Sequence, residues 1–272
     1  MANKSNIFSQ GIKSCRNNLF FHPYSRQDSG TFKNTPDRKI LLGLTTITRG
    51  EWENKVREID KLGLREIALF LTGLDFKERR ELYQLLENTK LTSVPHVHLR
   101  NDMEINELNY LNNKFGTEIF NAHPELDPYH LLFDYTNFEK KIYIENTQEY
   151  VPADNELKKY AGLCLDLSHW ESVKLDKGEN SQENLKIKKV LKKYKIAVNH
   201  ISAIKLNKII HHDSFLNKDF HCYHSHLLGD LKELDYVKKY KNYLADTISI
   251  ELENSLSEQL EVKKYLEKIL NL

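Results

Sequence analysis

Six apolar runs of this sequence carry a histidine, an aspartate or a glutamate at or near their C-terminal ends. In chain order these residues are His96 and His98, His123, Glu145, Asp166 and His169, His200, and Glu251. Three further histidines, His221, His224 and His226, follow the run that contains His200. Imidazole nitrogens and carboxylate oxygens form mixed sites for Zn, Mn, Co and Fe(II). The pattern therefore predicts a site for a divalent metal, provided that the ends of these runs meet in space.

The segments that must position these residues alternate between short apolar runs and amphipathic stretches. The expected strands span residues 40–47, 66–71, 93–99, 118–121, 141–144, 163–167, 196–204 and 247–252. The expected helices span residues 51–62, 76–86, 106–115, 185–194, 231–243 and 253–270. Eight strands alternating with helices indicate an α/β protein with a parallel sheet, and a (β/α)8 TIM barrel would bring every strand end to one mouth. An open doubly wound sheet is the alternative, but no GxGxxG turn follows the first strand.

Three segments depart from this alternation. Residues 1–38 show no clear hydrophobic period, so we expect an N-terminal extension that precedes a barrel domain over residues 39–272. Residues 171–184 are predicted to be a polar insertion, and residues 205–229 a long loop between the seventh and eighth strands. The extension contributes no ligand cluster, whereas the long loop holds three of the candidate histidines.

Charge, hydropathy and cysteine content argue against several classes of protein. With 40 basic and 39 acidic side chains the formal net charge is +1, which does not suit a strongly basic nucleic-acid or membrane-surface protein. No apolar run approaches 18 residues, and the first residues do not resemble a signal peptide. The three cysteines are widely spaced, so we expect a cytoplasmic protein without a disulfide framework and leave its oligomeric state open. No Walker-type GxxxxGK[ST] or GxSxG motif occurs.

Three short segments resemble motifs of the xylose-isomerase-like barrel superfamily, which includes sugar isomerases, ketose 3-epimerases and endonuclease IV. They are Ile-Glu-Asn-Thr at 144–147, Leu-Cys-Leu-Asp-Leu-Ser-His at 163–169, and the Leu-Gly turn at 228–229. The resemblance extends over roughly residues 39–271. It implies a core site for one divalent metal (Mn, Zn, Co or Fe), with Glu145, Asp166, His200 and Glu251 as the ligands.

The epimerase branch of the superfamily implies proton transfer through an enediolate, with Glu145 and Glu251 as the catalytic acid/base pair. His169 would then contact the substrate. The resemblance thus favours a metal-dependent isomerase or epimerase whose partner is a small carbohydrate-like molecule, a sugar or a sugar phosphate. The family's arginine after the strand-seven histidine is missing, because the segment after His200 contains only Lys205 and Lys208 as basic residues. Lys205 is a candidate for binding a substrate phosphate.

The endonuclease IV branch implies a trinuclear zinc phosphodiesterase with further histidine ligands. The matching residues are His96 or His98, His123, His169, and either Asp219 with His221 or the pair His224 and His226. The spacing of Asp219 and His221 differs from the family pattern, and Ile201-Ser202-Ala203 replaces its Asn-Asp pair. We therefore expect one well-occupied metal, or two, with the extra histidines mainly holding substrate or ordering the loop. A barrel that uses its metal in another reaction, or only to bind a ligand, is the third reading.

Overall fold

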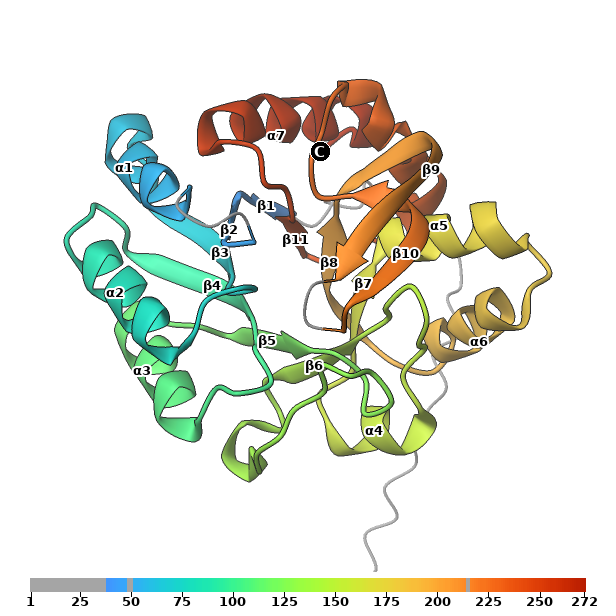
Figure 1. The fold of residues 1–272 in the computed structure, drawn as a ribbon, viewed down its shortest axis with the longest axis horizontal. Coiled ribbons are helices and arrows are strands. Elements are labelled where there is room, and N and C mark those ends of the chain that lie inside the picture. Colours follow the sequence, from blue (N-terminus) through green and yellow to red (C-terminus); the bar gives the residue numbers. More distant parts are fainter. Residues whose placement is uncertain (1–37, 48–50, 214–215) are drawn as a thin grey trace, which may run out of the picture. The chain divides into compact units, whose positions relative to one another are not determined.

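The computed structural model describes residues 38–47, 51–213 and 216–272, and its centre is a nine-stranded sheet whose neighbours are all parallel. The order around the sheet is β1-β11-β8-β7-β6-β5-β4-β3-β2. The strands are β1 Lys39–Leu41, β2 Gly43–Thr45, β3 Glu66–Phe70, β4 Ser93–His98, β5 Ile119–Ala122, β6 Ile142–Glu145, β7 Leu163–Asp166, β8 Ile196–Ile201 and β11 Thr247–Ile250. Helices surround the strands (Figure 1).

The sheet closes because β1 and β2 are two halves of one interrupted strand. Only Leu42 separates them, yet β1 pairs with β11 and β2 pairs with β3. Gln259 holds the chain at the break between β1 and β2, since its side chain accepts from Gly43 N at 2.8 Å and donates to Gly43 O at 2.9 Å. A Cβ at Gly43 would lie 2.0 Å from Ile250 O, so the close approach requires glycine. Counted as one, β1 and β2 make an eight-stranded barrel, and the predicted (β/α)8 fold is confirmed.

The outer layer consists of helices that pack their apolar faces on the barrel. They are α1 Trp52–Leu62, α2 Phe76–Glu87, α3 Ile105–Phe115, α4 Asp154–Lys159, α5 Leu167–Lys177, α6 Gln182–Leu191 and α7 Leu256–Leu270, with 3-10 segments η1 Thr136–Phe138 and η2 Leu231–Tyr243. Alternate strand residues such as Ile67 and Leu69 face the helices and are fully buried with Leu82 and Leu86. The other strand face lines the barrel interior, where polar residues collect at one end.

Two sequence predictions about connections were wrong. Residues 171–184 are not an insertion, because α5 starts directly after β7 with Asp166 as its cap and buries Trp170 and Val173. Residues 205–229 are not a loop, because β9 Ala203–Asp213 and β10 Lys218–Ser225 form an antiparallel hairpin. Asn217, at φ 47°, precedes β10 in the left-handed region that asparagine tolerates.

The predicted N-terminal extension falls, apart from Arg38, outside the described residues and stays a prediction. Within the part of the chain that is described, no helix is long and apolar enough to cross a membrane.

Candidate metal centre

Four strand ends bring Glu145, Asp166, His200 and Glu251 together inside the barrel. One ligand atom from each lies within 4.8 Å of all the others, and all four residues are buried. The parallel register produces this convergence, because Asp166 of β7 is level with His200 of β8, and Ser249 of β11 is also level with His200. Glu145 closes β6 and Glu251 directly follows β11. The four predicted core ligands therefore form one group.

The donor atoms of this group suit a cation. His200 Nδ1 lies 3.3 Å from Glu145 Oε1 and 3.2 Å from Glu251 Oε2, but neither contact has hydrogen-bond geometry within the described structure. Asp166 uses Oδ1 to accept from Ser168 Oγ at 2.6 Å and from His169 N at 2.7 Å. Its Oδ2 is buried without a hydrogen-bond partner among the described residues. Because buried polar atoms are nearly always partnered, these atoms fit a divalent ion held by the four side chains.

The pKa values show how strongly the carboxylates interact with their surroundings. Burial raises the pKa of Asp166, and the nearby charge of Glu145 adds to that rise although His169 opposes it. Burial also disfavours the charged form of Glu251, but the imidazoles of His226 and His200 outweigh it and lower its pKa to about 2. For Glu145, His200 and His98 likewise outweigh burial and hold the pKa well below its usual range. Three carboxyl groups share one buried site, and a bound cation would favour the charged form of Asp166 in particular.

A second donor group contains His98, His123 and Glu145. His98 Nε2 lies 3.2 Å from Glu145 Oε2, while its Nδ1 is 3.0 Å from Leu99 O. His123 Nδ1 is 3.0 Å from Asp127 Oδ1. A carbonyl or carboxylate at Nδ1 makes that nitrogen an N–H donor, so the contact with Asp127 leaves Nε2 of His123 available to a metal. Both ring nitrogens of His98 face oxygen atoms, so its Nε2 would bind a metal in place of the contact with Glu145 Oε2.

A third donor group contains His169, His224 and His226. His169 Nδ1 lies 3.1 Å from Asn146 O, which fixes the same tautomer, and its ring centroid is 4.5 Å from that of His224. The Nδ1 atoms of His224 and His226 are buried and have no hydrogen-bond partner in the described part of the chain. His226 Nδ1 is 3.8 Å from Glu251 Oε1, so this group adjoins the four-residue group.

Three candidate residues, His96, His221 and Asp219, are not members of these donor groups. His96 is fully buried below the centre, with Nδ1 2.9 Å from Ser249 Oγ and Nε2 2.8 Å from Asn121 Oδ1. His221 is exposed on β10, where a register shift between Cys222 and His224 separates it from the two histidines that reach the centre. Asp219 contacts His212 at 2.7 Å instead of the centre. Of the two sequence alternatives for the loop, His224 and His226 are the pair that the structure brings in.

Asn121 is a site residue that the sequence reasoning missed. Its Nδ2 donates to Glu145 Oε2 at 2.5 Å, and its Oδ1 faces His96 Nε2. Since His96 Nε2 must then be the donor, His96 Nδ1 accepts from Ser249 Oγ. The position of Asn121 at the end of an expected strand was the available signal, but amide side chains were not among the ligand types sought.

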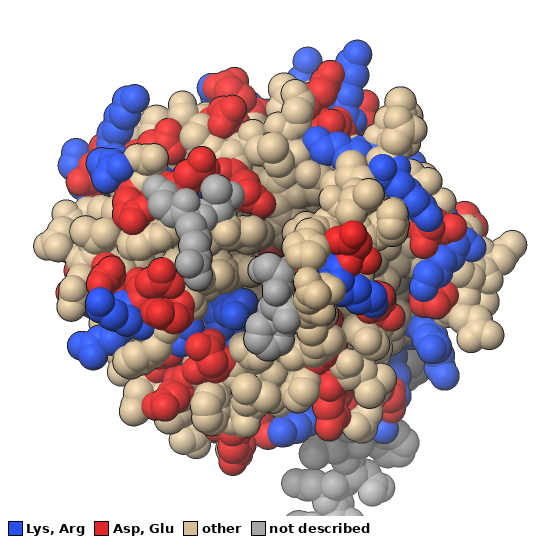
Figure 2. All heavy atoms as spheres, in the orientation of Figure 1, with Lys and Arg blue, Asp and Glu red and all other residues tan. Residues whose placement is uncertain are grey.

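A cavity of about 450 Å³ opens above the centre at the mouth of the barrel. Among its described lining residues are Glu145 and Glu251, but not Asp166 or His200. The histidines of the second and third groups line it as well, and the β9–β10 hairpin contributes one wall through His211. Figure 2 shows this face of the molecule, with acidic and basic side chains interspersed around the hollow. The cavity is large enough for a small molecule.

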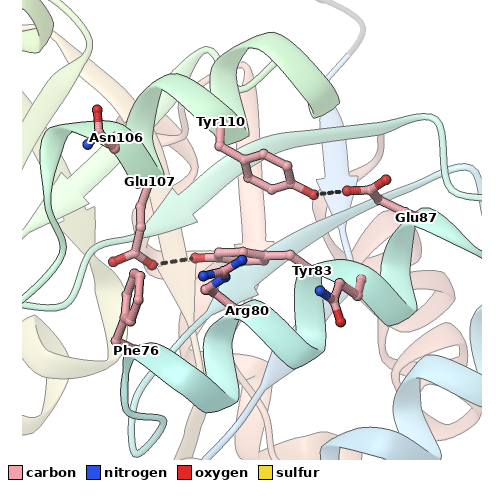
Figure 3. Close-up of a pocket in the computed structure, with 8 residues that line it drawn as sticks. Phe76, Arg80, Tyr83, Glu87, Asn106, Glu107 and Tyr110 are labelled. Carbon is pink, nitrogen blue, oxygen red and sulfur yellow. Dashed lines mark hydrogen bonds between the residues drawn. The ribbon is translucent and has the colours of Figure 1, made fainter.

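Another pocket lies away from the mouth, between α2 and α3 (Figure 3). Its aromatic wall includes Tyr83 and Tyr110, whose rings are 5.2 Å apart. Its hydroxyl and carboxyl groups are paired with each other: Tyr83 donates to Glu107 at 3.2 Å and Tyr110 to Glu87 at 2.5 Å. Because these groups satisfy one another, the chemistry is assigned to the mouth cavity.

Comparison with known proteins gives matches at the level of structure. No family model and no curated protein matches the chain. A xylose isomerase-like TIM barrel protein from Mycobacterium smegmatis, solved in complex with magnesium, has 14% identity and a TM-score of 0.44, covering 86% of this chain and 96% of its own. The chain is similar to xylose isomerase-like barrels.

Two further solved structures show how broad this similarity is. A D-tagatose 3-epimerase-like protein has 14% identity and a TM-score of 0.40, over 85% of this chain and 98% of its own. An HpcH/HpaI aldolase from Desulfitobacterium hafniense has 12% identity and a TM-score of 0.39, over 87% and 94%. These values carry no functional assignment, so the function has to be argued from the residues of this chain.

Proposed function

We propose that this chain is a divalent-metal-dependent isomerase or epimerase that acts on a small hydroxy-carbonyl molecule such as a sugar. The observation that carries the proposal is that only two of the four core residues line the cavity. Glu145 and Glu251 reach the cavity, whereas Asp166 and His200 lie beneath it. Two carboxylates from β6 and β11 therefore face the same space and can act on one substrate.

The roles of the side chains follow from their positions. Glu145, Asp166, His200 and Glu251 would hold the ion, which when bound supplies positive charge to the substrate oxygens beside the reacting carbon. One of the two cavity carboxylates removes the proton next to the carbonyl, and the other returns a proton on the opposite side. Asn121 holds Glu145 in place through its 2.5 Å hydrogen bond. The imidazoles around the cavity donate to and accept from substrate hydroxyls.

Hydrogen–deuterium exchange tests the proposal. The metal-loaded protein is incubated in deuterated water with a panel of aldoses, ketoses and their phosphates, and label is sought at the carbon next to the carbonyl. Glu145→Gln and Glu251→Gln should each lower the exchange rate by at least about 100-fold. Glu171→Gln, which removes a buried carboxylate of α5 that accepts from Tyr240 and does not line the cavity, serves as the matched control. Exchange that survives both core substitutions would refute the assigned acid/base pair.

A multinuclear phosphodiesterase is the second candidate, and the two additional donor groups favour it. These two groups offer ring nitrogens of five histidines beside the core, the second group through Glu145 and the third next to Glu251. Adjacent metals are typical of enzymes that cleave phosphate esters. We expect one tightly bound equivalent of metal per chain, retained by His98→Ala and His224→Ala. The second candidate would be favoured if wild type bound nearly three equivalents of metal per chain and the two variants bound fewer. It would also require cleavage of bis(p-nitrophenyl) phosphate and no sugar exchange. Stable metal binding without either activity would leave a ligand-binding role.

A further inference from the structure

Arg100 lines the same cavity as Glu145 and Glu251. It lies two residues beyond His98, the last residue of β4, in the segment that leads from β4 to α3. His96, further back on β4, is buried and hydrogen bonded, and His98 belongs to the second donor group beside Glu145. The segment after β4 thus brings a basic side chain to the cavity into which the two carboxylates reach.

The guanidinium of Arg100 has no anionic partner in the described part of the chain. Its Nε is buried without a hydrogen bond, and no carboxylate forms an ion pair with it there. The nearest acidic neighbour in sequence, Asp102, is instead paired with Arg79 at 3.1 Å. A half-buried arginine without a partner is costly, because the desolvated charge receives no compensation.

Among the described residues that line the cavity, Arg100 is the single lysine or arginine. Lys205, which the sequence offered as a phosphate ligand, is absent from that lining and forms an ion pair with Glu233 at 2.8 Å. The phosphate role predicted for Lys205 is therefore better filled by Arg100.

We propose that Arg100 binds the phosphate group of a phosphorylated sugar whose reacting carbons lie between Glu145 and Glu251. This inference rests on the proposed function and names its substrate class. The guanidinium fork matches the geometry of two phosphate oxygens, which an amine or a hydroxyl does not. Arg100, Glu145 and Glu251 line one cavity of about 450 Å³, so one small molecule can reach both the carboxylates and Arg100.

Binding of inorganic phosphate tests the anion site without relying on catalysis. Isothermal titration is performed on the full chain with and without divalent metal, for wild type, Arg100→Met and Lys205→Met. We expect wild type and Lys205→Met to bind phosphate in both metal states, and Arg100→Met to lose at least 10-fold in affinity. Circular dichroism and thermal melting check that Arg100→Met is folded; Arg100→Lys, which keeps the charge, should retain part of the affinity. Equal affinity in wild type and Arg100→Met, or binding by the metal-loaded form alone, would overturn the proposal.

Kinetics then separate this proposal from the assignment of function. In the exchange assay, Arg100→Met should raise KM for ribose 5-phosphate 10- to 100-fold and leave the exchange of ribose within about twofold. Glucuronate serves as the carboxylate probe, and dependence on Arg100 for it but not for the phosphate would overturn the choice of phosphate. Phosphate binding through Arg100 without any sugar exchange would refute the isomerase function and leave the anion site standing. Exchange of neutral sugars alone, unaffected by Arg100→Met, would support the isomerase function and refute the phosphate site at Arg100.

Discussion

Asn121→Ala should weaken both the fold and the metal site, because Asn121 connects two buried groups. The residue is fully buried on β5, where it donates to Glu145 Oε2 at 2.5 Å and accepts from His96 Nε2 at 2.8 Å. Alanine removes both hydrogen bonds at once. The His96 N–H then has no acceptor, and one Glu145 oxygen loses the donor that orients it.

The expected magnitudes follow from the two atoms left behind. A buried polar atom that loses its partner costs about 1–3 kcal/mol, so the loss of two partners should lower the free energy of unfolding by about 2–6 kcal/mol. Groups that orient a metal ligand typically contribute about 10- to 100-fold to metal affinity. Asn121→Ala should therefore bind divalent metal about 10- to 100-fold more weakly than wild type.

Urea denaturation and competition with a chromogenic chelator measure the two effects. Asn184→Ala is the matched control, because Asn184 is equally buried but bonds Trp170 Nε1 at 2.7 Å in the outer helical layer. The control should lose stability without losing metal affinity. If Asn121→Ala kept its metal affinity within about twofold while remaining folded, Asn121 would not orient Glu145 and the geometry argued for the centre would be wrong.

Three further predictions concern the barrel around the site. Burial lowers the pKa of Lys55 to about 8, against 10.5 in the unfolded chain, so the free energy of unfolding should rise between about pH 8 and 10.5, by up to about 3 kcal/mol. Lys55→Met should abolish that rise in pH-dependent urea melts. Arg79→Met should cost about 3–5 kcal/mol by leaving Glu107 buried and unpaired, and adding Glu107→Gln should recover part of the loss in chemical denaturation. A chain that starts at Arg38 should keep the helical circular dichroism of the full chain, because the first barrel strand begins at Lys39; insolubility would contradict this.

The sequence alone predicted the fold class, and the resemblance to the xylose-isomerase-like superfamily singled out the four residues that meet inside the barrel. Periodic apolar runs separated by amphipathic stretches indicated the order of the eight barrel strands, since this signal is local. The same runs placed Glu145, Asp166, His200 and Glu251 at strand ends, and a barrel has one mouth to which all strand ends lead. These predictions needed no knowledge of distances.

Tertiary structure decided which of the remaining polar residues belong together. His96 and His98 lie two residues apart on β4 and so project to the same side of the sheet. Their depth in the barrel decides that His96 is buried and hydrogen bonded whereas His98 reaches the cavity. The hairpin register, with its shift after Cys222, selected His224 over His221. Arg100 gained significance only because no described carboxylate pairs with it. Such outcomes depend on contacts between segments far apart in the chain, which hydrophobic periodicity does not encode.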